Sequence, residues 1–251
     1  MEQLTVIYLA FVGLIFGSFF SVVGLRVPLK QSIVRPRSSC PNCKRMLTGK
    51  ELIPVVSYLI QGGRCRSCKA PISPIYITVE IVTAILFAIT PLLIGWSSEI
   101  LIAYTLISLL VIITVSDLAY MIIPDKVLLF FASLFLLLHI YPGSLHIIDS
   151  LFGAAVGFGI LLVIALISNG GMGGGDIKLF AVLGLLLGVK LVILALFFAA
   201  LYGALLGSLL IIIGIVKRNE PIPFGPYIAL ATLTSYFFGE KIVNWYFGVL
   251  I

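Results

Sequence analysis

The chain has 251 residues, of which 61% are hydrophobic and only 10% are charged, and its mean hydropathy is +1.23. Because soluble domains carry about 25% charged residues, this composition excludes an ordinary soluble protein and predicts an integral membrane protein. The net charge is uneven: segment 26–73 holds ten of the sixteen Lys and Arg residues and one acid, Glu51, and the rest of the chain is acidic. A basic loop beside membrane segments stays in the cytoplasm, so the charge requires no nucleic-acid partner.

Seven apolar runs are candidate membrane helices, for which about 20 residues cross a hydrocarbon core of about 30 Å. They cover residues 4–25, 74–94, 100–116, 127–141, 147–167, 177–216 and 226–250. The sixth run has 40 residues, so as one straight helix it would measure about 60 Å. We expect it to turn at Gly188-Val189-Lys190, which gives eight membrane helices in total.

The sequence therefore predicts an all-α polytopic membrane protein in three parts: a first transmembrane helix (1–25), a cytoplasmic loop domain (26–73) and a transmembrane domain (74–251). The first helix lacks the basic start of a cleaved signal peptide, so we expect it to be retained. With the basic loop inside, counting the crossings puts the N-terminus outside. The same count puts Asp117 and Asp176 on the cytoplasmic side.

All four cysteines lie in the basic loop, as the pairs Cys40/Cys43 and Cys65/Cys68, each in the pattern C-x2-C. A reducing compartment disfavours stable disulfides, and two such pairs can bind one zinc ion tetrahedrally. The alternatives are a redox dithiol or four unpaired thiols. Because the loop has few large apolar residues, a metal would supply folding energy that its core lacks, and four protein ligands make that zinc structural.

Two aspartates stand at the edges of apolar runs: Asp117 ends the run 100–116, and Asp176 precedes the run that begins at residue 177. An ionisable group at the rim of a membrane segment is costly and marks a functional site. Asp176 taken alone is explained as a helix N-cap. A helix C-terminus disfavours an anion, so capping does not explain Asp117. Two carboxylates that meet at one depth predict acid–base chemistry on a water molecule, as in aspartic proteases.

The segment 170–175 contains five glycines in six residues directly before Asp176. Glycine lets another chain approach closely, so Gly173 and Gly175 are candidate substrate-binding residues, and a flexible linker is the alternative. Asp125, at the expected start of a membrane helix, Glu80 within a span and Lys178 are supporting residues of this site. The spacing of a phosphate-binding Walker loop is not found here.

A set of motifs in a fixed order resembles the prepilin peptidases, the type IV prepilin leader peptidases and N-methyltransferases that are aspartic proteases of the GxGD type. The resemblance covers nearly the whole chain. The motifs are Gly17-Ser-Phe, Arg35-Pro-Arg-Ser-Ser-Cys-Pro-Asn-Cys43, Glu51-Leu-Ile-Pro-Val-Val-Ser57, Cys65-Arg-Ser-Cys68, Tyr76-Ile-Thr-Val-Glu80, Asp117-Leu118, Ile123-Pro-Asp125, Gly173-Gly-Gly-Asp-Ile-Lys178 and Pro223-Phe-Gly-Pro226.

This resemblance implies an endopeptidase at the cytoplasmic face of the plasma membrane, with Asp117 and Asp176 as the catalytic pair. Its substrates would be prepilin-like precursors, in which a short basic leader ending in glycine precedes a hydrophobic helix. Many members also methylate the new N-terminal amine with S-adenosylmethionine, an activity linked to the cysteine-containing loop. The compact pattern further resembles members that process competence pilins.

Other classes of protein fit the sequence less well. An ion-coupled transporter would carry its acids near the bilayer midplane, and a non-catalytic zinc scaffold or a protease that cuts within the bilayer would not need two aspartates at one rim. The two histidines, His139 and His146, lie near the outer end of the fourth predicted span. This placement excludes them from a serine or cysteine hydrolase site, or a histidine-bound metal, at the cytoplasmic face.

Overall fold

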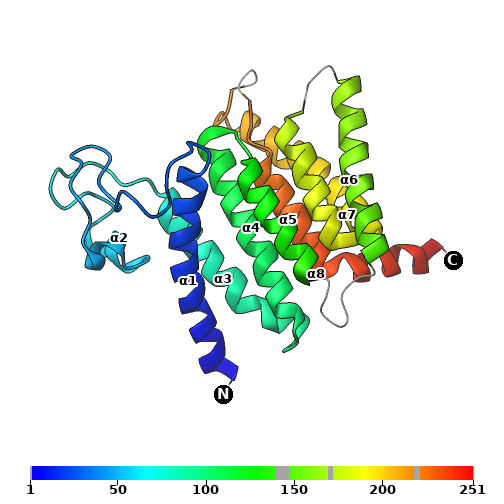
Figure 1. The fold of residues 1–251 in the computed structure, drawn as a ribbon, viewed down its shortest axis with the longest axis horizontal. Helices are drawn as coiled ribbons and strands as arrows, with labels where there is room; N and C mark the ends of the chain where they lie inside the picture. Colours follow the sequence, from blue (N-terminus) through cyan, green and yellow to red (C-terminus); the bar gives the residue numbers. More distant parts are fainter. Residues whose placement is uncertain (1, 139–146, 169–171, 218–220, 251) are drawn as a thin grey trace. The chain divides into compact units, whose positions relative to one another are not determined.

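The computed structural model describes residues 2–138, 147–168, 172–217 and 221–250, and His139 and His146 lie outside these ranges. Within the described residues every regular element is a helix (Figure 1). The helices are α1 (Glu2–Arg26), η1 (Gly49–Leu52, a 3-10 helix), α2 (Val56–Ile60), α3 (Ile75–Ile94), α4 (Glu99–Tyr120), α5 (Asp125–Leu138), α6 (Ile147–Ile167), α7 (Gly174–Ile212) and α8 (Gly225–Leu250).

Five of the described helices, α1, α3, α4, α6 and α7, are long and apolar enough to cross a membrane. This confirms a helical multi-pass membrane protein. Helix α5 has only 14 residues, and α8 is not one of the five. The number of eight crossings therefore stays a prediction.

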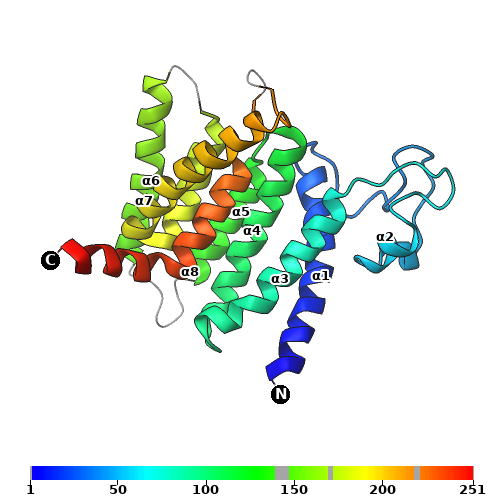
Figure 2. The same ribbon diagram turned by 180° about the vertical axis from the view of Figure 1, so that it is seen from behind.

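Helix α7 is 39 residues long but is interrupted at Gly188, whose φ of 70° and ψ of −179° are not helical. A positive φ of this size favours glycine, which has no Cβ to clash with the backbone. Figure 2 shows the chain changing direction within α7. The structure thus confirms the expected break in the long apolar run at Gly188.

The chain divides by its internal contacts into two compact units, residues 1–115 and 116–251. In the first unit α1 and α3 pack side by side at small residues. A Cβ added at Gly13 would lie 2.7 Å from Ala84 Cα, and one added at Gly17 would lie 2.8 Å from Glu80 Cα. Such close backbone contact is the usual way in which membrane helices associate.

In the second unit α6 packs against both halves of α7 through glycines. A Cβ added at Gly153 would lie 2.8 Å from Gly188 Cα, so the α6 backbone lies directly against the break. A Cβ added at Gly157 would lie 2.6 Å from the Phe180 carbonyl oxygen and 3.1 Å from Val192 Cγ2. The packing of α6 therefore holds the two halves of α7 in place on either side of Gly188.

We expect Gly153→Val to destabilise the protein, because the new side chain meets the backbone at Gly188 rather than a movable side chain. Overpacking of this kind costs about 1–3 kcal/mol. The matched control is Gly159→Val in the same helix, where an added Cβ meets nothing within 4 Å. Thermal unfolding in detergent micelles should show a lower midpoint for the first variant. Equal midpoints would contradict the close packing of α6 on the break.

Candidate active site and metal centre

Asp117 lies in the last turn of α4 and is buried. Its Oδ2 accepts a hydrogen bond of 2.6 Å from the backbone N–H of Gly225, the first residue of α8. The first N–H groups of a helix have no partner within the helix and carry partial positive charge. Asp117 therefore caps α8, and the argument that capping does not explain this residue was wrong because it considered only the helix to which Asp117 belongs.

The contact between Asp117 and α8 requires a glycine. A Cβ at Gly225 would lie 2.9 Å from both Cβ and Oδ2 of Asp117. Sequence reasoning included Gly225 only within the motif Pro223-Phe-Gly-Pro226 and gave it no site role. A glycine in a short segment with a proline at each end was the available signal for a close backbone approach.

Asp176 is the third residue of α7, and the N-cap of that helix is Gly173. The interpretation of Asp176 as the N-cap itself was therefore wrong by three positions. Its side chain turns back toward the N-cap, since a Cβ added at Gly173 would lie 3.1 Å from Asp176 Oδ2. An acid in the first turn interacts favourably with the positive end of the helix dipole.

The two aspartates line one pocket of about 320 Å³ within the second unit. The pocket also contains Gly173, Gly175, Asp125 and Lys178, so every predicted residue of the second unit lies around one cavity. The two carboxyl groups are close enough to interact electrostatically. The remaining lining residues, which sequence reasoning did not propose for the site, are Met121, Ile122, Ile123 and Gly174.

One wall of the pocket is the short connection between α4 and α5. Met121 has a φ of 54°, and its N–H binds the Asp117 carbonyl oxygen at 2.8 Å, so the chain turns sharply directly after α4. The buried Ser116 hydroxyl donates a hydrogen bond to the Ile122 carbonyl oxygen. These bonds hold the wall in place beside the Asp117 carboxylate.

At the rim of the pocket, Lys178 Nζ lies 2.8 Å from Asp125 Oδ1 and 2.9 Å from its Oδ2. Asp125 is the first residue of α5, as expected, and the ion pair joins it to the first turns of α7. Both side chains are more than half exposed. Exposed ion pairs contribute little to stability.

Glu80 does not line this pocket. It lies in α3 of the first unit, where it is buried and its Oε2 accepts a hydrogen bond of 2.7 Å from the backbone N–H of Val55. Its role as a supporting residue of the aspartate pair stays a prediction, and the contact with Val55 gives this carboxylate a partner in the loop.

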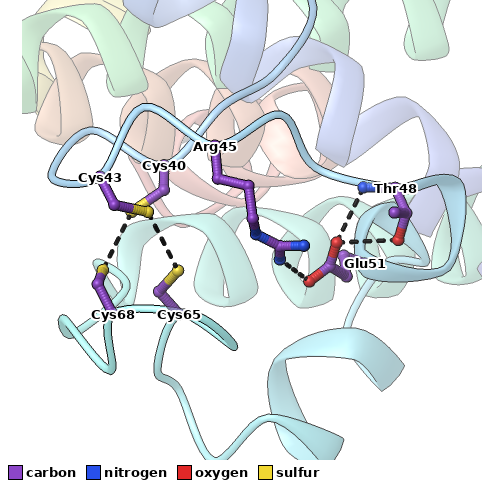
Figure 3. Close-up of polar contacts among 7 residues, drawn as sticks. All are labelled: Cys40, Cys43, Arg45, Thr48, Glu51, Cys65 and Cys68. Carbon is purple, nitrogen blue, oxygen red and sulfur yellow. Dashed lines mark hydrogen bonds and ion pairs between the residues drawn. The ribbon is translucent and has the colours of Figure 1, made fainter.

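The four cysteines gather in one cluster, with their Sγ atoms all within 4.8 Å of one another (Figure 3). The Sγ atoms of Cys40 and Cys68 are 3.7 Å apart, and those of Cys43 and Cys65 are 4.0 Å apart. Zinc–sulfur bonds of about 2.3 Å in a tetrahedron place sulfur atoms about 3.8 Å apart. The residues present therefore fit a zinc ion with four thiolate ligands.

The two cysteine pairs are built in the same way. Lys44 N–H donates to the Cys40 carbonyl oxygen, and Lys69 N–H donates to that of Cys65. Lys44 and Lys69 have matching positive φ angles of 58° and 59°. Each pair is closed by an isolated antiparallel bridge, Ser39 with Met46 and Arg64 with Pro71. The short repeat in the sequence is thus a structural repeat.

Backbone N–H groups favour the thiolate form that a metal needs. The N–H of Ala70 lowers the pKa of Cys68 to about 6, and the N–H groups of Cys68 and Ser67 lower the pKa of Cys65. A separate polar contact lies beside the first cysteine pair: Arg45 forms an ion pair with Glu51 of η1, which also binds Thr48 (Figure 3).

The N–H of Thr48 is the main cause of the low pKa of Glu51, about 2. Because this pKa lies below the ordinary value of 4.5, the stability that the ionised Glu51 gives the loop is complete above that value. It is lost as the pH falls toward 2.

Two family models match the chain. Residues 11–94 match the bacterial peptidase A24 N-terminal domain, and residues 104–208 match the type IV leader peptidase family. A prepilin leader peptidase/N-methyltransferase of Bacillus subtilis is 44% identical over 93% of this chain and 94% of its own length. The chain belongs to the type IV leader peptidase family. This confirms the family assigned from the motifs.

Other members of this family are more distant. Proteins of the same name from Aeromonas hydrophila and Pseudomonas aeruginosa are 35% and 31% identical to this chain. They match over 86% and 93% of the chain and over 76% and 90% of their own lengths. No solved structure is significantly similar to this chain.

We expect this family member to bind about one zinc ion per chain and Cys43→Ser to lose it, because three thiolates no longer fill the tetrahedron. The control is Met46→Ser, since the Met46 side chain is exposed on the same loop. Metal analysis of protein purified without chelators measures both. Zinc-free parent protein, or unchanged zinc in Cys43→Ser, would contradict the four-thiolate centre.

Gly175→Val should abolish leader cleavage while leaving the protein folded. An added Cβ would lie 2.8 Å from Ile123 Cβ, so the substitution must displace this residue of the pocket wall. If the clash is the cause, Gly175→Ala alone should lower activity and adding Ile123→Ala should restore part of it. Activity is measured by the mass of the processed precursor. Normal cleavage by Gly175→Val would contradict the role of this glycine.

Proposed function

We propose that this chain is a membrane aspartic endopeptidase that removes the leader peptide of type IV prepilin-like precursors and methylates the new N-terminus. The observation that carries the proposal is the convergence of Asp117 and Asp176 on one pocket. They are 59 positions apart in the sequence and come from the end of one helix and the start of another. The family membership and the names of the relatives support the same activity.

The chemistry needs one carboxylate and one carboxylic acid. The ionised member removes a proton from a water molecule, whose oxygen attacks the carbonyl carbon of the scissile peptide bond. The protonated member donates a hydrogen bond to the carbonyl oxygen and stabilises the negative charge that develops there. Collapse of the tetrahedral intermediate breaks the C–N bond, and the leaving amine takes up a proton from the pair.

The surroundings of the pair suit this division of labour. The hydrogen bond from Gly225 fixes the orientation of the Asp117 carboxylate, and residues 173–175 place unsubstituted backbone beside Asp176. On this side of the pocket a precursor segment can therefore approach Asp176 along backbone that carries no side chains. The hydrogen bonds at Asp117 and Ser116 hold the α4 side of the pocket, which favours a held near-attack geometry. The hydrophobic helix of the precursor would pack among the membrane helices.

The metal centre has a separate, structural role in this proposal. Cys40, Cys43, Cys65 and Cys68 would hold zinc and keep the cytoplasmic loop folded. S-adenosylmethionine would supply the methyl group for the new amine. The family and the names of the relatives support methylation.

The proposed topology places the N-terminus outside and both the loop domain and the aspartate pocket at the cytoplasmic face of the plasma membrane. It has eight crossings, and the protease domain is the transmembrane domain 74–251. The partners would be precursors of a pilus, secretion or competence system. The positions of the basic residues in the sequence support this orientation.

We expect Asp117→Asn and Asp176→Asn each to abolish cleavage, because neither carboxyl group can act as both base and acid. The matched control is Glu240→Gln, which removes an exposed carboxylate paired with Lys190 outside the pocket and should leave cleavage unchanged. Asp125→Asn should retain appreciable activity, since the pair with Lys178 is exposed. Each variant is expressed together with a prepilin-like precursor, and the intact mass of the product is measured.

The mass also separates the two activities. Loss of the leader alone shows cleavage, and an additional methyl group on the new N-terminus shows methylation. More than a few per cent of the parent cleavage rate in either Asp117→Asn or Asp176→Asn would defeat the assignment of the pair. An uncut precursor with the parent enzyme would defeat the proposed function itself.

A further inference from the structure

The cytoplasmic loop carries exposed apolar side chains that its own fold does not use. We define the apolar segment as residues 52–60, which include η1's last residue and all of α2. Five of its nine side chains are large, apolar and between 44% and 81% exposed: Leu52, Ile53, Val56, Leu59 and Ile60. A concentration of this kind marks an interaction surface.

Tyr58 shows that α2 has an inner and an outer side. Its hydroxyl donates to the Ile72 carbonyl oxygen at 3.5 Å, and its ring lies against Gly63, so this side chain faces the rest of the loop. Leu59 and Ile60, directly after it, are 66% and 81% exposed. The loop thus buries one side of α2 and leaves the other uncovered.

A hydrogen bond to α3, one of the candidate membrane helices, fixes the level of the apolar segment along that helix. The N–H of Val55, directly before α2, donates to Oε2 of the buried Glu80. Glu80 is the sixth residue of α3, about 8 Å along the helix from its start. Gly17 of α1 packs on the same point. In both Figure 1 and Figure 2, α2 lies level with the adjoining part of α1 and not beyond its end.

Interfacial apolar side chains reach about 5–10 Å below the headgroup boundary, which matches the depth of the bond to Glu80. The charge around the segment has the sign that such a surface attracts. Lys50 and Arg64 flank it and are exposed, and Glu51, the acid of this loop, already binds Arg45. Basic residues beside an apolar face bind membranes that contain anionic lipids.

We propose that the apolar segment docks on the anionic lipid surface of the bilayer in which the chain is embedded, with Leu59 and Ile60 inserted and Lys50 and Arg64 on the headgroups. The zinc-bearing loop is then a membrane-bound module and not a domain that hangs freely in the cytoplasm. This role is independent of the proposed cleavage chemistry.

The test uses the full chain in lipid nanodiscs with Trp96 and Trp245 changed to Phe and Ile60→Trp as the single tryptophan. Leu59→Trp is a second probe in case the first does not fold, and bound zinc checks the fold of each. In nanodiscs with phosphatidylglycerol, we expect blue-shifted emission and strong quenching by brominated lipid. Quenching should be weaker in phosphatidylcholine alone, and Lys50→Glu with Arg64→Glu should remove the difference.

Each other outcome contradicts the proposal. Emission typical of water that iodide quenches in both lipids would show a free loop. Emission shielded from both iodide and brominated lipid would show that protein, either the second unit or another copy, covers the segment. Equal quenching by brominated lipid in the two compositions would remove the role of anionic lipid.

Discussion

The candidate site depends on a single hydrogen bond, from the N–H of Gly225 to the carboxylate of Asp117. It joins the end of α4 to the beginning of α8, which are separated by more than a hundred residues in the sequence. A carboxylate at the end of a helix is poorly placed for its own helix dipole and well placed for the start of another. This contact lets a charged group remain buried at the edge of a membrane segment with a defined orientation, which an acid–base catalyst requires.

Glycines at contact points are the common means by which the chain brings its helices and its site together. Gly13 and Gly17 allow α1 to approach α3, Gly153 allows α6 to approach α7, and Gly225 allows α8 to approach Asp117. Lipid provides no hydrophobic force between apolar helices, so close van der Waals packing is what remains to associate them. The absence of a side chain allows helix packing at Gly13, Gly17 and Gly153. At Gly225 it allows the contact that orients the Asp117 carboxylate.

Much of this organisation could be predicted from the sequence. Apolar runs of about the length that crosses a bilayer indicate membrane helices. The 40-residue run required a break that the structure has at Gly188, and the spacing of four cysteines is specific enough to predict their cluster. The residues that could not be predicted are those whose partners come from elsewhere in the fold. The cap that Asp117 provides for α8 and the bond between Glu80 and Val55 depend on tertiary contacts. The register of Asp176, three residues into its helix, depends on where a glycine-rich segment becomes helical, which a run of glycines leaves undetermined.

The break at Gly188 determines how far the beginning of α8 lies from the end of α4. A continuous α7 of 39 residues would extend about 58 Å, and Gly225 would then lie far from the end of α4. Asp117 would then have no helix N-terminus beside it, and the two aspartates would not line one pocket. One residue with a positive φ thus lets α7 change direction, and the chemistry at the pocket depends on this break within the helix.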